Sequence, residues 1–496
     1  MSLLGLDIGS TSIKGVVFDE VGGILSQASA SYKTVWQGNT AEADAMDMWK
    51  AASEVIRRAS EKSPDIEAIG ISSHGETFVP VDGDFKPVYN AVMNSDNRAV
   101  TETASWEKDN GKKRIYGITG MPLHTMFAVN KIMWMSKNKP EVAKETNLFL
   151  SAGDFILAQL GVKPLTDYSL AGRTMGFDVS RRGWSEEILK EAGIRLENMP
   201  ECVPSGTLAG RLGAQAAQRL GLKKGTAVAV GGHDQPLSAL GCGAIESGHV
   251  TDSAGTYECL AAISDTPRNT DAAFACNLNS YCHAAAGKYI TLAFFPAGFA
   301  INWFIDEFCC EDKVRAEQKG ISVYAYLSEK VQKDPTGLCV TPHLVGACNP
   351  YWDMRAKGAI YGITPGASRH KLFKAVYEGI AMELALNTDV LERTCGAFDT
   401  VRISGGNAKL PFSLQLRADI TGKRFDTMDT RETVCKGAAM LAGLSCGTYR
   451  DLADAVQNTV HTDKRYTPDT AVHESYALQK AAYDALYPSL EKIRSL

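Results

Sequence analysis

The feature that most constrains the fold is a run near the start of the chain in which two strands follow one another without a helix between them. Residues 3–25 read LLGLDIGSTSIKGVVFDEVGGIL: an apolar strand, small and hydroxyl-bearing residues around Gly9, and a second β-prone stretch that ends at a Gly22-Gly23 turn. Glycine-rich loops that hold phosphates usually join a strand to a helix, because the N-terminal amides of the helix bind the anion. The run therefore predicts a hairpin with a polar tip, and it excludes a Walker loop and a dinucleotide-binding fingerprint.

The tip of this hairpin carries groups that can bind phosphate. Those groups are the backbone around Gly9, the hydroxyls of Ser10, Thr11 and Ser12, and the ammonium of Lys14. Asp7, at the end of the first strand, would then face a Mg²⁺ ion bound to the phosphates. The alternative is an ordinary hairpin with a solvated tip, in which Asp7 bonds to nearby amides and Lys14 lies on an exposed edge strand.

A second run in the middle of the chain has the same organisation. Residues 249–264 read HVTDSAGTYECLAAIS, which is again a strand, small and hydroxyl-bearing residues around Gly255 and Thr256, and a strand. Directly before it, a buried strand over 228–230 and a glycine turn precede a helix that Pro236 opens. Two hairpins of similar chemistry, one near the start of each half, predict a duplicated α/β architecture that holds nucleotide phosphates between its halves.

Length and composition exclude several classes of protein. A chain of 496 residues is longer than a single hydrophobic core usually supports, so two domains are expected. The net charge is −5 and no basic cluster occurs, which argues against nucleic acid as a partner. The N-terminus has no basic region, no apolar run approaches the ~20 residues that span a bilayer, and the 12 cysteines form no CxxC pair. We therefore expect a protein of the reducing cytoplasm that inserts into no membrane.

Four stretches resemble the FGGY carbohydrate kinases, a family within the actin and hexokinase-like ATPase superfamily, and they follow the order found in that family. The first phosphate segment resembles GLDIGSTSIKGVVFD at 5–19, and the catalytic aspartate with the second phosphate segment resembles GGHDQPLSALGCGAIESGHVTDSAGT at 231–256. The C-terminal signature resembles PYWDMRAKGAIYGIT at 350–364. The adenosine-binding segment and the helix behind it resemble ISGGNAKLPFSLQLRADITG at 403–422 and CKGAAMLAG at 435–443.

The resemblance extends from Leu4 to about Gly447. It implies an α/β fold of two actin/hexokinase-like (ribonuclease H-like) domains with a nucleotide cleft between them. The N-terminal domain, 1–245, would carry the sugar site, the catalytic base and the first phosphate hairpin. The C-terminal domain, 246–496, would carry the second phosphate hairpin and the adenosine site.

The resemblance also implies which residues hold ATP and Mg²⁺. Asp7 would be the carboxylate on the metal side, acting through bound water because Mg²⁺ keeps several waters. The phosphates would be held by Gly9, Ser10, Thr11, Ser12, Lys14, Gly255 and Thr256. Gly405, Gly406 and Asn407 follow an apolar strand and would let the backbone approach the adenosine closely, with an ordinary strand-to-helix turn as the alternative.

Asp234 is expected to be the catalytic base. Transfer of a phosphoryl group to a sugar hydroxyl needs a group that takes the hydroxyl proton, and a carboxylate with an ordinary pKa near 4 is ionised at neutral pH. The alternative is that Asp234 only caps the helix that begins at Gln235-Pro236.

The acceptor is expected to bind in the N-terminal half. The loop GISSHGETFVPVD at 70–82 corresponds to the substrate loop of the family, and it follows a buried strand. The residues implied as substrate-binding are His74, Gly75, Glu76, Asp96, Met126, Asp234 and Gln235. For two of them a structural role is the alternative: His74 as a hydrogen-bonded structural histidine, and Asp96 as one half of a surface ion pair with Arg98.

The expected activity is ATP-dependent phosphorylation of a sugar or polyol, foremost a ketopentose such as xylulose. Gly75 and Met126 stand where glycerol kinases carry an arginine and a tyrosine, which disfavours glycerol. His233 before the base is similar to deoxyketohexose kinases, whereas TDYSLAGRTMGFDVSRRGW at 166–184 is similar to xylulokinases. A glycerol- or erythritol-type polyol kinase and an ATP-dependent sensor or structural protein of the actin-like branch remain alternatives, and a homodimer is left open.

Overall fold

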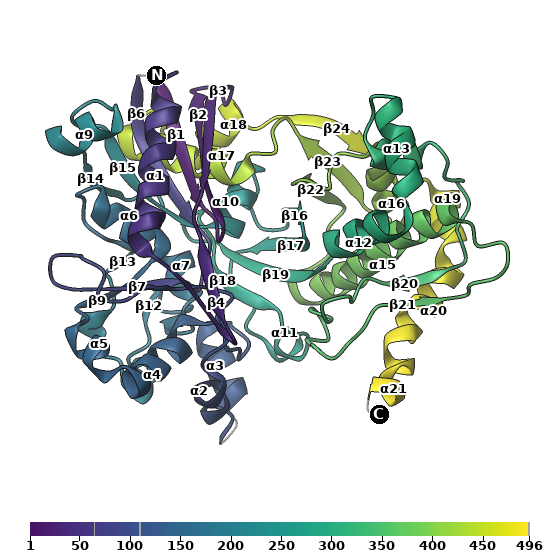
Figure 1. The fold of residues 1–496 in the computed structure, drawn as a ribbon, viewed down its shortest axis with the longest axis horizontal. Coiled ribbons are helices and arrows are strands. Elements are labelled where there is room, and N and C mark those ends of the chain that lie inside the picture. Colours follow the sequence, from purple (N-terminus) through teal and green to yellow (C-terminus); the bar gives the residue numbers. More distant parts are fainter. Residues whose placement is uncertain (64, 109–110, 495–496) are drawn as a thin grey trace.

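The computed structural model describes residues 1–63, 65–108 and 111–494, and it has two α/β halves side by side (Figure 1). We call residues 1–245 the N-terminal half and residues 246–496 the C-terminal half. The purple and teal N-terminal half lies on the left of Figure 1, and most of the green and yellow C-terminal half lies on the right. Each half is built around one mixed sheet.

The sheet of the N-terminal half has the strand order β14-β15-β6-β1-β2-β3. Its strands are β1 (Ser2–Ile8), β2 (Ser12–Asp19), β3 (Ile24–Ser31), β6 (Ile66–Ser73), β14 (Leu208–Arg211) and β15 (Ala227–His233). β1 and β2 form the antiparallel hairpin predicted from the sequence, with Asp7 opposite Lys14, and β6 and β15 continue the sheet in parallel. Because β2 has a partner strand on each side, the alternative that placed Lys14 on an edge strand is wrong.

The sheet of the C-terminal half has the order β18-β19-β17-β16-β22-β23-β24. Its strands are β16 (Val250–Ala254), β17 (Tyr257–Ser264), β18 (Asn279–Cys282), β19 (Tyr289–Pro296), β22 (Thr400–Ser404), β23 (Arg424–Met428) and β24 (Thr462–Tyr466). The hairpin β16–β17 is the second one predicted, and β22 and β23 follow it in parallel. The order β19-β17-β16-β22-β23 repeats the order β3-β2-β1-β6-β15, so the predicted duplication is confirmed.

A helix follows the fifth strand of each repeat and lies at the junction of the halves. These helices are α10 (Asp234–Gly241) and α17 (Thr433–Cys446). Although α17 belongs to the C-terminal half, it packs on the N-terminal sheet, and Figure 1 shows it among the strands on the left. A Cβ atom at Gly5 would lie 1.8 Å from the carbonyl oxygen of Cys435, and one at Gly70 would lie 1.9 Å from that of Ala438. Only glycine therefore allows α17 to approach the sheet this closely.

Other elements extend the N-terminal half and cover the sheets. A second sheet has the order β4-β5-β8-β7-β9, with β4 (Thr34–Gln37), β5 (Thr40–Ala43), β7 (Phe78–Val81), β8 (Ala91–Val92) and β9 (Leu148–Ser151). The helices used below or covering the sheets are α1 (Ala45–Ser60), α2 (Val100–Ser105), α3 (Gly111–Thr119), α4 (Ala128–Asn138), α6 (Ala152–Gln159), α7 (Tyr168–Gly172), α12 (Gly298–Phe308), α15 (Arg369–Cys395) and α16 (Pro411–Thr421). Buried apolar side chains of both halves form the cores between these layers.

Three observations bear on the expectations from composition. Within residues 1–63, 65–108 and 111–494, no helix is both long and apolar enough to cross a membrane. The twelve cysteines are all free. The part of the chain that the structure describes has no group of three or more His, Cys, Asp or Glu side chains arranged to hold a metal ion.

Candidate active site

A cavity of about 430 Å³ has walls from both halves, and we call it the central cavity. Its acidic, basic and imidazole side chains come from the N-terminal half: His74, Glu76, His124, Arg173, His233 and Asp234. The facing wall is largely apolar and comes from the C-terminal half: Tyr257, Cys259, Leu292, Phe294, Cys348, Trp352 and Met354. Gly75, Met126 and Gln235, implied as substrate-binding by the resemblance, also line it. The cavity lies at the carboxyl ends of β6 and β15, where ligands usually bind in open α/β sheets.

Asp234 projects into the central cavity from the start of α10. It is the first residue of that helix, and His233 is the N-cap, so the capping alternative does not describe the structure. The side chain is 29% exposed, and its Oδ1 atom is buried without a hydrogen-bond partner. Burial raises the pKa of Asp234 to about 8, and the negative charges of Asp7 and Glu76 add to the rise while Arg173 opposes it. The ordinary pKa expected from the sequence is therefore wrong, because the site removes part of the water around the carboxylate and places two negative charges near it.

Arg173 and Glu76 form a buried ion pair in the wall of the central cavity. The Nε atom of Arg173 donates to Oε1 of Glu76, its Nη2 atom forms an ion pair with the same oxygen, and Nη1 donates to Oδ1 of Asn279 at 2.8 Å. Glu76 has a φ of 63°, which is unusual for a side chain of this size. A Cβ atom at Gly75 would lie 3.0 Å from Cβ and Cγ of Arg173, so glycine leaves room for the aliphatic part of that side chain.

Arg173 was missed as a site residue in the sequence. It lies directly after α7, within the stretch 166–184 that indicated only a subfamily. The structure puts the first carbons of its side chain beside Gly75, the position where the sequence was interpreted as having lost an arginine, and its guanidinium on the next residue, Glu76. The site therefore keeps a guanidinium, which comes from another element of the fold.

His74 is held by hydrogen bonds on both ring nitrogens. Its Nδ1 lies 2.7 Å from the backbone oxygen of Ile8, so it donates there, and its Nε2 accepts from the hydroxyl of Thr77 at 2.7 Å. Burial lowers the pKa of His74, and the ring is therefore neutral. These contacts fit the structural alternative: His74 ties the end of β1 to the substrate loop, and its ring nitrogens have no free capacity for a ligand.

Asp96 lies behind the cavity wall rather than in it. It is fully buried, accepts a hydrogen bond from the backbone of Ala41 at 2.6 Å and pairs with Arg98. The ion pair with Arg98 exists, but inside the protein and not on its surface. Asn94 lines the cavity instead, and its Oδ1 atom is buried without a hydrogen-bond partner. The segment 94–98 therefore contributes to the site through Asn94, Ser95 and Asn97, which the resemblance did not indicate.

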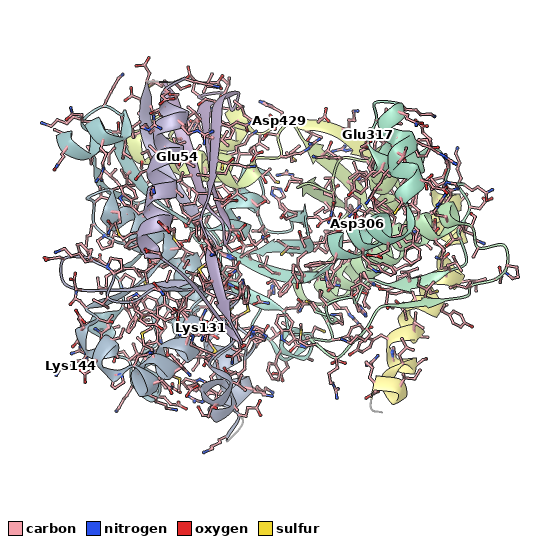
Figure 2. The ribbon with its side chains drawn as sticks, in the orientation of Figure 1. Glu54, Lys131, Lys144, Asp306, Glu317 and Asp429 are labelled. Atoms are coloured by element: carbon pink, nitrogen blue, oxygen red, sulfur yellow. The ribbon has the colours of Figure 1, made fainter. Side chains whose placement is uncertain are left out.

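Lys131 holds two segments of the site in place through hydrogen bonds to their backbone. It lies on α4, is fully buried, and is labelled inside the lower part of the left half in Figure 2. Its Nζ atom donates to the backbone oxygens of Glu76 at 2.9 Å and Met93 at 2.8 Å. Burial lowers the pKa of Lys131 to about 7. One ammonium group thus fixes both the substrate loop and the segment that presents Asn94.

The first hairpin presents Asp7 and Lys14 beside an exposed tip. Ser12 and Thr11 are exposed, and Gly9 donates its backbone N–H to the oxygen of Ser12 at 3.0 Å. Lys14 is half-exposed and pairs with Glu432 at 2.9 Å, so its ammonium is shared with the C-terminal half. The tip is thus open to a ligand.

A magnesium ion fits the surroundings of Asp7. The Oδ1 atom of Asp7 is buried and has no hydrogen-bond partner, and burial raises the pKa of this carboxyl to about 6 while Lys14 opposes the rise. A nearby cation would satisfy that oxygen. Mg²⁺ is commonly held by one or two carboxylates together with waters and substrate phosphates, so a single carboxylate suffices here.

The second hairpin and the loop after β22 lie against each other. Asn407 donates from its side chain to the backbone oxygen of Gly255 at 2.7 Å, and from its backbone to that of Ala254 at 2.9 Å. Gly405 has a φ of 98°, and a Cβ atom there would lie 2.6 Å from the oxygen of Ala254. Asn407 therefore holds the second hairpin through these two hydrogen bonds. A Cβ atom added at Gly406, by contrast, would meet only open space.

The start of α12 completes this region and was not predicted from the sequence. Gly298 donates its backbone N–H to the oxygen of Thr256 at 3.0 Å, and a Cβ atom there would lie 2.9 Å from the oxygen of Gly255. The structure thus brings one further glycine, Gly298, together with four residues predicted from the sequence: Gly255, Thr256, Gly405 and Asn407.

Comparison with known proteins identifies the chain. The N-terminal domain of the FGGY family of carbohydrate kinases matches residues 2–241, and the C-terminal domain of that family matches residues 251–446. The chain belongs to the FGGY family of carbohydrate kinases. An autoinducer-2 kinase of Enterobacter sp. is 28% identical over 98% of this chain and 94% of its own length, and a gluconokinase of Bacillus subtilis is 26% identical over 94% and 91%.

A solved FGGY-like structure extends the match to three dimensions. The ligand-bound xylulose kinase of Lactobacillus acidophilus superposes with a TM-score of 0.90 at 25% identity, covering 99% of this chain and 98% of that one. The two-domain actin/hexokinase-like fold expected from the sequence is confirmed. This FGGY protein is a carbohydrate kinase of a family that uses ATP, so the sensor or structural protein considered as an alternative is not supported.

Proposed function

We propose that this FGGY kinase transfers the γ-phosphoryl group of ATP to a hydroxyl of a neutral, open-chain acceptor with more than three carbons, foremost a ketopentose such as xylulose. The observation that carries the proposal is the pairing of Arg173 with Glu76 beside the unpartnered Oδ1 atom of Asp234. The pair favours an uncharged acceptor, and the carboxylate oxygen favours one that gives up a hydroxyl proton.

Charge in the central cavity favours a neutral acceptor over an aldonate. Among the described residues that line it, Arg173 is the one side chain with a permanent positive charge, and Glu76 neutralises it. Burial lowers the pKa of His74, His124 and His233, so these rings are neutral as well. A carboxylate such as that of gluconate would have to leave water without a free cation to meet it, which is costly.

The size of the cavity favours an acceptor longer than glycerol. Its volume of about 430 Å³ falls in the range of sites that enclose whole small molecules. Because Arg173 supplies a guanidinium in the cavity wall, paired with Glu76, the preference for a longer acceptor rests on this volume and on Met126, which offers no hydroxyl. An erythritol-type polyol is the second candidate, since it is also neutral and longer than glycerol.

The proposed chemistry uses Asp234 as the base. The acceptor oxygen forms a bond to the γ-phosphorus, the bond from that phosphorus to the β-γ bridging oxygen breaks, and ADP leaves. Asp234 takes the proton of the acceptor hydroxyl on a carboxylate oxygen, and its raised pKa makes it a stronger acceptor than an ordinary aspartate. Mg²⁺ held next to Asp7 would neutralise charge on the phosphates. The exposed amides and hydroxyls of the two hairpin tips would orient the phosphates.

A coupled ADP-release assay tests the proposal directly. The panel contains xylulose, a deoxyketohexose, erythritol, glycerol and gluconate, each with ATP and Mg²⁺. We expect ADP release that depends on the acceptor, with the highest kcat/KM for a neutral acceptor of four to six carbons. Glycerol or gluconate as the best acceptor would overturn the arguments from volume and charge, and ADP release independent of any acceptor would overturn the proposed transfer.

A further inference from the structure

The geometry points to a positioning pair for the base that spans the two halves: Tyr281, from the C-terminal half, fixes the tautomer of His233 so that the ring presents an N–H group to Asp234. This inference rests on the role proposed above for Asp234. It assigns functions to a tyrosine and a histidine that touch the base without taking the proton.

Three groups lie in a row beside the central cavity. The hydroxyl oxygen of Tyr281 is 2.7 Å from Nδ1 of His233, and Nε2 of the same ring is 3.2 Å from Oδ1 of Asp234. Tyr281 and His233 are buried. That oxygen of Asp234 has no hydrogen-bond partner in the described part of the chain, and the ring nitrogen of His233 is a polar neighbour at contact distance that does not yet bond to it.

The state of the imidazole follows from its surroundings. Burial, together with the positive charge of Arg173 and the nearby His74, lowers the pKa of His233 well below its usual range, so the ring is neutral. A neutral ring has one donor nitrogen and one acceptor nitrogen. The hydroxyl of Tyr281 remains protonated because burial raises its pKa, so it can donate to Nδ1. In the arrangement we infer, the hydroxyl donates to Nδ1, so the ring proton sits on Nε2 and faces the carboxyl group of Asp234, whereas the other tautomer would turn a lone pair toward it.

Tyr281 is held rigidly at the junction by the strand that carries it. β18 is the edge strand of the C-terminal sheet, and Ser280 donates its backbone N–H to the oxygen of Gly120 in the N-terminal half at 2.9 Å. A Cβ atom at Gly172 would lie 3.2 Å from the side chain of Tyr281, so the tyrosine packs directly on α7. The guanidinium of Arg173 lies 5.5 Å from the centre of the Tyr281 ring. The C-terminal half thereby sets the orientation of a base that belongs to the N-terminal half.

The titratable groups around the pair set the direction of the expected pH effect. Asp7, Glu76 and Arg173 act on Asp234, while Arg173 and His74 act on His233. None of these groups is changed when the hydroxyl of Tyr281 is removed. An N–H group beside Asp234 favours the ionised carboxylate, so losing it raises the pKa of the base.

The central test is the variant Tyr281→Phe in the coupled assay with the best acceptor. We expect kcat to fall about tenfold with the KM values for ATP and acceptor nearly unchanged, since a misplaced base affects transfer more than binding. The acid limb of the kcat profile should move up by about one pH unit, which corresponds to the same tenfold change.

The matched control is Tyr116→Phe, because Tyr116 is also buried and its hydroxyl donates across the same junction to the oxygen of Leu278 at 2.9 Å. Its kcat and acid limb should stay at the wild-type values.

Substitutions of His233 test the same point without altering Tyr281. His233→Gln keeps an amide N–H near the position of Nε2, whereas His233→Asn places it near Nδ1, so the first should retain much more kcat than the second. In the His233→Gln background, Tyr281→Phe should have no further effect. The inference is overturned if Tyr281→Phe keeps the wild-type kcat and acid limb, if Tyr116→Phe shows the same loss, or if the two substitutions act additively.

The variant Asp234→Asn separates this inference from the proposed function. If Asp234→Asn is inactive while Tyr281→Phe behaves as wild type, the positioning role of Tyr281 and His233 is refuted, while the proposed role of Asp234 as the base is retained. If Asp234→Asn keeps its turnover, both are wrong.

Discussion

Removing the negative charge of Glu76 should change which acceptors the kinase uses. In Glu76→Gln the side chain keeps its shape, but the buried guanidinium of Arg173 loses its counter-charge. At about 5 Å and an effective dielectric constant near 20, a guanidinium attracts a carboxylate by about 3 kcal/mol. An acceptor that carries a carboxylate can recover part of this energy, and a neutral acceptor cannot. We expect the ratio of kcat/KM for gluconate to that for xylulose to rise at least about tenfold, equivalent to ~1.4 kcal/mol.

The same substitution should cost stability. Breaking a buried ion pair by removing one partner usually costs ~3–5 kcal/mol, and the amide of glutamine keeps one hydrogen bond, so we expect a loss of about 3 kcal/mol in the free energy of unfolding. Urea denaturation measures this loss, and the coupled assay measures the acceptor ratio.

The control for this prediction is Glu102→Gln. Glu102 lies on α2, is buried and pairs with Lys137 at 3.2 Å, but it does not line the central cavity. The substitution Glu102→Gln removes one carboxylate from the same half and should leave the ratio of kcat/KM for gluconate to that for xylulose unchanged. An unchanged ratio in Glu76→Gln, or an equal rise in Glu102→Gln, would refute the reasoning that Glu76 neutralises the cavity.

Three further predictions concern the base and its supports. Because burial raises the pKa of Asp234 to about 8, kcat/KM for the acceptor should rise between pH 6 and pH 8 as the carboxylate ionises, and a flat profile would contradict this. Lys131→Met should raise the KM for the acceptor more than that for ATP, because the buried oxygens of Glu76 and Met93 lose their donor at ~1–3 kcal/mol each; equal effects on both KM values would argue against it. Gly70→Ala should lower the unfolding free energy by at least ~1–3 kcal/mol, measured by urea denaturation, since its Cβ would overlap α17; unchanged stability would mean that the helix can move away.

The two hairpins could be predicted because their information is local. Apolar alternation, a glycine and a few hydroxyls within about fifteen residues define each one, and the second repeats the chemistry of the first. The contacts that shape the central cavity are different in kind. Arg173 meets Glu76 across 97 residues of sequence, and Tyr281 meets His233 across 48. No periodicity within one element indicates which side chains of distant elements will meet.

Burial accounts for the remaining differences between sequence and structure. The pKa of Asp234 depends on how much water the folded site excludes, which a local motif does not contain. Asp96 and Asn94 are two residues apart, yet one lies behind the wall and the other in it, because Asp96 is used to bind Ala41 and Arg98. A short motif therefore indicates the right segment but not which of its side chains faces the ligand.

The position of α17 has a consequence for how the chain is made. This helix covers the N-terminal sheet at Gly5 and Gly70, but it ends only at Cys446. During synthesis the first sheet must therefore wait for almost the whole polypeptide before that face is closed. Domains that follow one another in a chain usually fold in the order in which they leave the ribosome. Here the first half can reach its final packing only after most of the second has emerged, so the two halves mature together.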